Sequence, residues 1–372
     1  MSGGPAGAAG REERALLLSG SIGMGHDALA AACATALAAR GQPSETLDAM
    51  RLLGRRGGSA GEAVFRAMLS VPGLFDAFHF AALRPGSRLA LLADAASSRQ
   101  VVPRLRAYLD EHPVDLVISV FSTGAAAVSR LAGRYPAMSH VVFCTDVTPH
   151  RLWVHPNVDL YLVTSAVAEA AVRRFEPDAR VLVLPAPARP AFYQAPTQAA
   201  ARAALSVPPQ EPCVLLMSGA WGLGPVAAAA QALGDAGVHV LAVAGRNARL
   251  ERKLLAAAAR QPRVRAFGFT DAVPALMAAA DLVITSSGDT CTEARVVGRP
   301  LLLLDVVQGH GRDNLQHELE LGEAAVTSPG MTDIVRSALA ALDRVKPPSS
   351  GPTASLAAFE EAFTAALATI GA

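Results

Sequence analysis

The sequence predicts an α/β protein of two domains, each with a parallel β-sheet between helices, that face each other across a central cleft. The chain has 372 residues, which exceeds one ordinary domain and fits two. Short apolar runs alternate with Ala-rich helical stretches, as in parallel β-α-β units. Each half carries a glycine-rich loop directly after its first apolar run, at residues 19–25 and 218–224. Because loops that follow parallel strands share one sheet edge, we expect both glycine loops to line the cleft.

Composition and charge exclude several classes of protein. Lys and Arg number 33 against 32 for Asp and Glu, which excludes a globally basic nucleic-acid-binding protein, so no nucleic acid partner is expected. Hydrophobic residues make up 51% and charged residues 17%, which is not the balance of a disordered chain. The four cysteines lie far apart with no CxxC pair. This spacing excludes a zinc ribbon, disfavours a disulfide framework and indicates a reducing, cytoplasmic compartment.

No targeting or membrane-spanning segment is recognised in the sequence. The start of the chain is Gly/Ala-rich without the apolar core of a secretory signal, and residues 1–13 are expected to form a disordered tail. The longest uncharged run, residues 213–234, has the length of a membrane span. Gly219, Gly222 and Pro225 interrupt it, however, so it predicts a strand, a glycine loop and a helix start.

The first half reads as an N-terminal Rossmann-like domain at residues 14–190. It begins with an apolar strand at residues 15–19, then a glycine loop, then a helix at residues 26–40 with one apolar face. Four further apolar runs predict the remaining strands. They lie at residues 114–120, 139–144, 159–164 and 181–184.

A Pro-rich stretch separates the halves, and a linker is expected at residues 191–212. The alternation of apolar runs and helical stretches then resumes and predicts a C-terminal Rossmann-like domain at residues 213–345. Its strands are expected at residues 214–217, 238–242, 264–267, 282–285 and 301–304. After a Pro/Ser/Gly break, a C-terminal amphipathic helix is expected at residues 352–371.

The most specific chemical signal is the stretch 285–293, which follows a strand and opens a helix. The backbone N–H groups and the positive end of that helix suit a diphosphate. Glu293, one turn into the helix, could accept hydrogen bonds from a ribose diol. The alternative is plain helix capping, with Asp289 as the N-cap and Thr292 or Glu293 reaching back.

Several segments together resemble a known family of glycosyltransferases. Residues 264–284, followed by Ser287-Gly288-x-Thr290-x-x-Glu293 and Gly298-x-Pro300, resemble the nucleotide-sugar half of that family. The family contains the monogalactosyldiacylglycerol synthases, the processive diacylglycerol glucosyltransferases and the peptidoglycan lipid-linked N-acetylglucosaminyltransferase. In the first half, the resemblance lies in three motifs. They are Gly23-Met24-Gly25-His26, the segment 144–159 and Pro187-Ala188-Arg189-Pro190 with Phe192.

The resemblance implies the GT-B fold and a hexosyltransferase. The C-terminal domain would hold a nucleotide-diphosphate sugar, taken to be a UDP-sugar, and the N-terminal domain the acceptor. Transfer would be inverting, would need no metal and no cofactor besides the donor, and would act on a diacylglycerol-like lipid at the inner face of the membrane. Two alternatives stay open: transfer to a soluble small molecule, favoured by the near-neutral charge, and a non-catalytic nucleotide-sugar-binding partner protein.

Three positions depart from the family pattern. Asp289 stands where the family usually has Leu, and a carboxylate would repel a diphosphate unless it points away. The family's Gly-Gln-Glu-x-x-Asn, which grips the donor sugar, reads here as residues 309–314 with His310-Gly311 in place of Gln-Glu. The junction glycine is replaced by Pro185-Ala186. The first two departures bear on the donor sugar, and the loss of Gln-Glu favours the non-catalytic alternative.

The candidate catalytic residues are His26 and Asp146. Inverting transfer needs a base for the acceptor hydroxyl, and His26 lies where the first glycine loop meets its helix. Asp146 follows a strand end, so it is expected either to orient His26 or to act as the base. The alternatives are a histidine bonded to its own turn and an Asx turn before Pro149.

The remaining candidates bind the donor or the acceptor, and each has a structural alternative. Arg246 would pair with the diphosphate or be solvated, Phe269 would stack near the base or pack on the sheet, and His310 would replace the missing amide or be an ordinary loop residue. The donor-binding candidates are Gly25, Gly219, Arg246, Phe269, Ser287, Gly288, Thr290, Glu293, His310 and Asn314. The acceptor-binding candidates are Trp153, His155, Phe75 and Phe78; the last two lie in an Arg- and Phe-rich stretch, residues 51–88, that suits a lipid interface or a plain helical hairpin.

Overall fold

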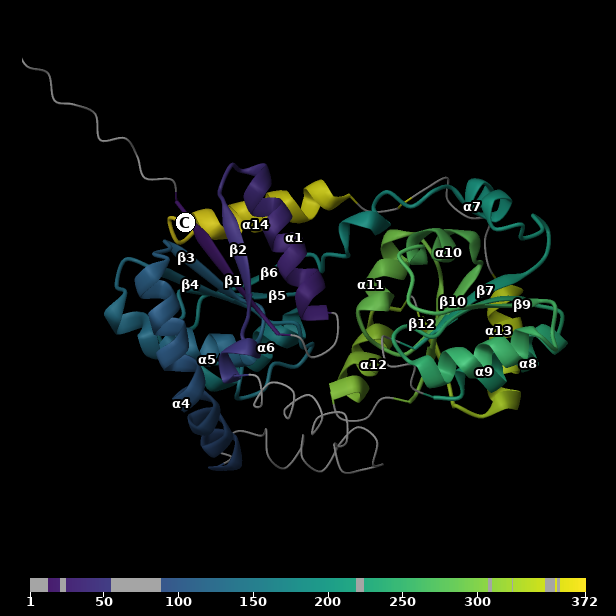
Figure 1. Ribbon diagram of the computed structural model, residues 1–372, viewed down its shortest axis with the longest axis horizontal. Coiled ribbons are helices and arrows are strands. Elements are labelled where there is room, and N and C mark those ends of the chain that lie inside the picture. Colours follow the sequence, from purple (N-terminus) through teal and green to yellow (C-terminus); the bar gives the residue numbers. More distant parts are fainter. Residues whose placement is uncertain are drawn as a thin grey trace, which may run out of the picture.

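The computed structural model describes residues 13–20, 25–54, 88–218, 224–306, 310–322, 324–344, 352 and 355–372. These residues form two parallel six-stranded sheets with helices on both faces of each (Figure 1). Nearly every central strand is fully buried, which is why the strands read as continuous apolar runs rather than alternating ones.

The first sheet has the strand order β2-β1-β3-β4-β5-β6. Helices α4, α5 and α6 cover one of its faces, and α1 and the C-terminal helix α14 cover the other. The strands are β1 Ala15–Ser19, β2 Ser44–Asp48, β3 Leu116–Ser119, β4 Ser139–Phe143, β5 Leu160–Val163 and β6 Val181–Val183. The helices are α1 Gly25–Ala39, α4 Arg88–Glu111, α5 Ser122–Leu131, α6 Ala166–Phe175 and α14 Leu356–Ala368, with short 3-10 turns at Arg51–Leu53 and Ala132–Arg134.

The second sheet has the strand order β12-β11-β10-β7-β8-β9. Helices α7, α10 and α11 pack on one face, and α8, α9 and α13 on the other. The strands are β7 Cys213–Met217, β8 His239–Val243, β9 Val264–Phe267, β10 Leu282–Thr285, β11 Leu301–Leu304 and β12 Ala324–Thr327. The helices are α7 Gln198–Ala204, α8 Val226–Asp235, α9 Ala248–Ala258, α10 Val273–Ala279, α11 Asp289–Val296, α12 His310–Glu320 and α13 Met331–Leu342, and a 3-10 turn at Pro190–Phe192 precedes α7.

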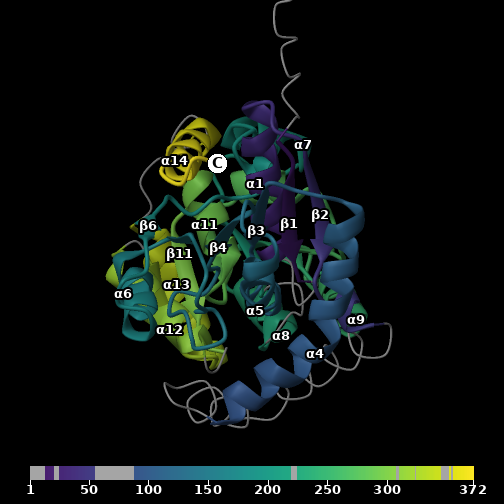
Figure 2. The ribbon, with the colours of Figure 1, turned by 90° about the vertical axis from the view of Figure 1, so that its left-hand side faces the viewer.

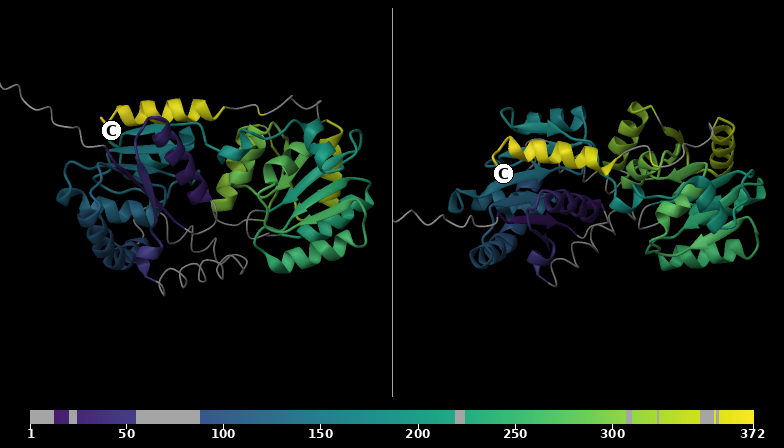
Figure 3. Two further views of the ribbon diagram at one scale, coloured as in Figure 1. Left: turned by 45° about the horizontal axis from the view of Figure 1, so that its top comes forward. Right: turned by 90° about the horizontal axis from the view of Figure 1, so that it is seen from above.

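The last helix returns to the first sheet. α14 lies along α1, and Phe359 and Phe363 are buried in the core beneath it, with the Phe359 ring stacked near Phe143 (Figures 2 and 3). Burying two phenylalanines of this kind contributes on the order of 2–3 kcal/mol each. The chain therefore crosses between the two sheets twice.

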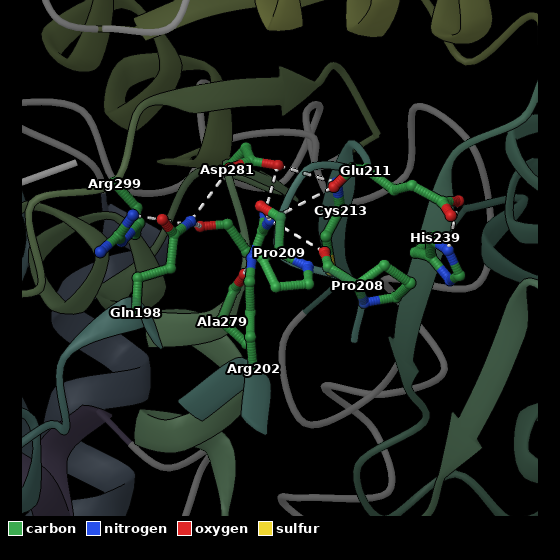
Figure 4. A network of polar contacts seen from close by, with 11 residues as sticks. Gln198, Arg202, Pro208, Pro209, Glu211, Cys213, His239, Ala279, Asp281 and Arg299 are labelled. Atoms are coloured by element: carbon green, nitrogen blue, oxygen red, sulfur yellow. Dashed lines mark hydrogen bonds and ion pairs between the residues drawn. The ribbon is translucent and has the colours of Figure 1, made fainter. Parts of the chain in front are cut away.

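The expected linker, residues 191–212, packs largely on the second sheet. Phe192 and Ala201 belong to the core of that sheet, and Arg202 anchors the segment through a buried polar network (Figure 4). The guanidinium of Arg202 donates to Asp281 Oδ2 at 2.6 Å and to the carbonyl oxygens of Ala279, Pro208, Pro209 and Glu211. Asp281 Oδ2 also accepts from the backbone N–H of Cys213 at 2.8 Å.

Candidate functional site

The candidate site lies at the carboxyl ends of both sheets, where the strand order reverses. In the first sheet β1 lies between β2 and β3, and in the second β7 lies between β10 and β8. Ligands of open α/β sheets bind at such points because the two adjacent loops diverge there. The expected base, His26, follows β1. The expected diphosphate loop, residues 285–293, follows β10, which neighbours β7.

His26 lies on the first turn of α1 with a well-defined orientation. Its Nδ1 is 2.8 Å from the carbonyl oxygen of Val120, the residue after β3. A carbonyl oxygen only accepts, so Nδ1 carries the proton and the neutral ring leaves Nε2 as the acceptor. Thr145 Oγ1 lies 3.4 Å from the same Nδ1, and the ring of Phe121 packs edge-on at 4.9 Å. The imidazole is thus held in the tautomer that a general base requires.

The loop after β4 also supports His26. Asp146 Oδ2 accepts from Trp153 Nε1 at 2.8 Å and lies 3.4 Å from His150 Nε2. The ring of Trp153 is 6.2 Å from that of His26. Asp146 therefore fixes the tryptophan beside His26, while Val120 and Thr145 contact Nδ1 of the imidazole and orient the ring. A role of Asp146 as the base stays a prediction.

The expected acceptor residues of this loop are buried. Trp153 is 2% exposed and His155 6%, and Trp153 belongs to the hydrophobic core beside β4 and β5. His155 Nε2 lies 2.8 Å from the carbonyl of Leu152, and its backbone N–H donates to the Tyr161 hydroxyl. This burial favours a supporting role for both residues, and their direct contact with an acceptor stays a prediction. Phe75 and Phe78 lie outside the described residues.

Two expected donor residues from different loops meet beyond the second sheet. Arg246 follows β8 and Phe269 follows β9, and the guanidinium lies 5.0 Å from the ring centroid. Phe269 is 52% exposed although it is a large apolar side chain. A cation stacked on an exposed ring gives a flat surface with positive charge, which suits a nucleotide base and its phosphates.

The start of α11 differs from the capping alternative. The N-cap residue is Gly288, in extended backbone with φ 176°, and it has no side chain to satisfy the N–H groups of the first turn. Asp289 is the first helical residue rather than the N-cap. The capping alternative with Asp289 at the N-cap is therefore wrong. Ser287 and Thr290 are buried on either side of this turn.

Two hydroxyl groups near this turn have no partner among the described residues. Ser218 follows β7 and Thr285 ends β10, the neighbouring strand. Both residues are buried, and Ser218 Oγ and Thr285 Oγ1 make no hydrogen bond. A buried polar atom without a partner costs stability, so these two hydroxyls are candidates to bind a ligand.

Glu293 is a buried carboxylate paired with a residue from the junction between the domains. The residue is 4% exposed, and Arg189 Nε donates to Oε1 at 2.7 Å. Burial raises the pKa of Glu293 to about 7, and the Arg189 guanidinium opposes this rise. The side chain expected to bind ribose is thus held by Arg189, a motif residue to which the sequence assigned no contact. A buried carboxylate whose pKa lies near neutrality is typical of functional sites.

The first turn of α11 touches the first turn of α1. A Cβ atom on Gly25 would collide with Asp289 Oδ2, so this contact requires glycine or a moved carboxylate. It brings the expected donor loop and the expected base together, as the facing of these two helices in Figure 1 illustrates. Among the other donor candidates, Asn314 is half-buried on α12, Gly219 lies outside the described residues, and the side chain of His310 is not described.

Several residues of this site escaped the sequence reasoning. Val120 acts through its backbone carbonyl, for which a sequence has no signal. Thr145 and Thr285 lie within the segments 144–159 and 285–293 that the sequence singled out, but the sequence assigned neither of them a role. Within the described part of the chain, no helix is long and apolar enough to cross a membrane.

Comparison with known proteins identifies two segments of the chain. Residues 88–181 match the family model of monogalactosyldiacylglycerol (MGDG) synthase, and residues 225–326 match that of the glycosyltransferase family 28 C-terminal domain. A probable chloroplastic MGDG synthase of Nicotiana tabacum is 30% identical over 244 residues, which cover 61% of this chain and 45% of that protein. The processive diacylglycerol β-glucosyltransferase of Bacillus subtilis is 30% identical over 231 residues, 60% of each chain. The chain spans about half the length of the curated relatives it matches.

The fold agrees with these matches. The crystal structure of MurG from Acinetobacter baumannii superposes with a TM-score of 0.57 at 12% identity and covers 96% of this chain and 100% of that one. At this identity the similarity establishes the fold alone. The expected GT-B architecture of two facing Rossmann-like domains is confirmed.

Proposed function

We propose that this chain, which carries an MGDG-synthase segment and a glycosyltransferase family 28 C-terminal domain, is an inverting glycosyltransferase. It would move a sugar from a UDP-sugar to a hydroxyl of a diacylglycerol-type lipid. The observation that supports the proposal is the contact between α11 and α1, because a donor loop at the start of α11 would then face the turn that holds His26. The names of the relatives in tobacco and Bacillus subtilis support the lipid acceptor.

Donor binding would use the second sheet. The diphosphate would lie at the first turn of α11, with the hydroxyls of Ser218 and Thr285 as additional partners and Arg246 as the counter-charge. Glu293 would accept from the ribose hydroxyls. Since Arg246 and the helix end supply positive charge to the leaving diphosphate, we propose that no metal is required.

The chemical step would use the first sheet. His26 Nε2 takes the proton of the acceptor hydroxyl as its oxygen attacks the anomeric carbon of the sugar. The new carbon–oxygen bond forms as the bond to the diphosphate breaks, and the electron pair leaves with UDP. The Val120 carbonyl holds Nδ1–H during this transfer, so the ring keeps its orientation as it becomes charged. Contact of the protein with the membrane surface would deliver the lipid.

A panel of UDP-sugars tests the proposal. We expect at least one of them to raise the melting temperature of the protein, and to be consumed when diacylglycerol vesicles are present. Consumption only with soluble acceptors would redirect the proposal to a small-molecule transferase. Binding without consumption under any acceptor would indicate a non-catalytic nucleotide-sugar-binding protein.

Replacing Glu293 should weaken donor binding. The variant Glu293→Gln loses the charged acceptor for the ribose hydroxyls, so we expect UDP-sugar affinity to fall by on the order of 1–3 kcal/mol. Because the pKa of Glu293 is about 7, its charged fraction rises between pH 6 and pH 8. Wild-type affinity should therefore rise about tenfold over that range, whereas the affinity of the variant should stay flat.

Isothermal titration with an intact UDP-sugar measures both effects. The sugar nucleotide is preferable to UDP, whose terminal phosphate titrates in the same range. Glu169→Gln, which removes a carboxylate paired with Arg173 on the surface of α6, serves as the control. A Glu293 variant that binds the donor like the wild type and only melts earlier would show that the pair with Arg189 is purely structural.

A further inference from the structure

Asp289 is the residue whose position the proposed donor site leaves unexplained. It stands where the glycosyltransferase family that this chain resembles usually has Leu, at the start of a helix that would face a diphosphate. The carboxylate of Asp289 lies against Gly25, on the first turn of α1. The side chain thus reaches from the expected donor loop to the other domain, an orientation that would reduce its repulsion with a diphosphate.

The charges around this carboxylate come from both domains. His26 on α1 and Arg189 at the junction both favour its ionised form, while Glu293, one turn further along α11, adds like charge. Burial is the largest influence and raises the pKa of Asp289 above its ordinary value. A buried carboxylate is costly unless a positive partner compensates it. Arg189 is the permanent cation near Asp289, and His26 on the facing helix becomes a second one when it takes a proton.

His26 has an orienting contact but needs a counter-charge during catalysis. The Val120 carbonyl fixes the ring without carrying net charge, and the carboxylate of Asp146 is bonded to Trp153. When His26 takes the proton of an acceptor, the ring becomes a cation in a partly buried setting. A nearby anion then stabilises that cation more than it stabilises the neutral ring, which lowers the barrier to proton transfer.

We infer that Asp289 is a positioning residue for the base: it supplies, from the donor domain, the negative charge that His26 needs on the acceptor domain. The inference rests on the proposed function, in which His26 is the base. Asp289 lies on α11 of the proposed donor domain and His26 on α1 of the proposed acceptor domain, so this pair joins the two halves of the proposed site.

A double-mutant cycle tests whether Asp289 acts through His26. Asp289→Asn should lower kcat roughly tenfold with the donor KM nearly unchanged, within the range of coupling between neighbouring groups. In a His26→Gln background the same substitution should cause no further loss, because the cation that Asp289 stabilises no longer forms. Asp289→Leu, which introduces the residue usual in the resembled family, should lower kcat as Asp289→Asn does. Asp333→Asn is the matched control, since it removes a first-turn carboxylate of α13 that accepts from Ser328 and Arg336.

The outcomes separate this inference from the proposed function. Independent, multiplicative losses in the two backgrounds would overturn it, because they would show that Asp289 acts without His26. Wild-type turnover in either Asp289 variant, with the melting temperature preserved, would also overturn it while leaving the transferase intact. If the wild-type protein transfers no sugar in the same assay, the proposed function fails and the inference fails with it.

Discussion

Replacing His26 with alanine is expected to lower kcat by about 10²–10⁴-fold while leaving donor affinity nearly unchanged. The reason is the geometry of the ring: Val120 O holds Nδ1–H at 2.8 Å, so Nε2 is the atom that can accept a proton. The donor, in contrast, would bind through the second sheet, to which His26 does not belong. Steady-state kinetics together with donor titration separate the two quantities.

The controls for this prediction lie on the same chain. His239→Ala removes a partly exposed histidine paired with Glu211, far from the strand ends that carry His26, and should leave turnover unchanged. Asp146→Asn should cause a smaller loss than His26→Ala, because its carboxylate holds Trp153 beside the ring. If both the His26 and Asp146 variants fold and keep near wild-type turnover, the base lies elsewhere.

Replacing Arg202 with alanine is expected to destabilise the protein by about 3–5 kcal/mol. The substitution leaves Asp281 without its ion-pair partner at 2.6 Å and removes the donor to four carbonyl oxygens. Arg202→Lys should recover only part of the loss, since an ammonium cannot reproduce the planar fork of five donors. The network lies at the amino ends of β7 and β10, the opposite end of the sheet from the site, so donor binding at permissive temperature should persist (Figure 4).

Calorimetric unfolding measures this effect. Arg252→Ala provides the control, because this arginine is exposed on α9 and donates to the carbonyl of Ala248 in its own helix. It should change the unfolding free energy by no more than about 0.5 kcal/mol. An Arg202 variant as stable as this control would show that the network contributes nothing beyond packing.

Much of the fold follows from local patterns in the sequence. The central strands are apolar runs buried on both faces, and three of them, at Ala15–Ser19, Leu282–Thr285 and Leu301–Leu304, have the predicted bounds, as does the edge strand Val264–Phe267. Two strands escaped notice, β2 and β12. Both are sheet edges, and neither needs an apolar run there: β2 reads Ser-Glu-Thr-Leu-Asp and is largely exposed. The return of the last helix to the first sheet also escaped, because amphipathicity gives a helix a buried face without saying against what.

For the site, too, the sequence predicted some residues and missed some contacts. His26, Arg246 and Glu293 could be named because each follows a strand end or opens a helix, and parallel sheets gather such positions at one edge. The pair of Arg189 with Glu293 and the contact of Asp289 with Gly25 could not be named. Each joins residues more than 100 positions apart, and neither leaves a periodic or compositional trace. The domain bounds and the assigned roles of the site residues stay predictions.

Transfer of a labelled sugar tests the central claim most directly. The purified protein would be incubated with UDP-sugars labelled in the sugar and with diacylglycerol vesicles, and the lipid phase would be extracted and analysed. We expect label in a glycosyl-diacylglycerol of inverted anomeric configuration, formed by the wild-type protein and reduced at least a hundredfold in His26→Ala, within the range for loss of a general base. Label that stays entirely in the aqueous phase with every donor, from a folded protein that binds the donor, would contradict the claim.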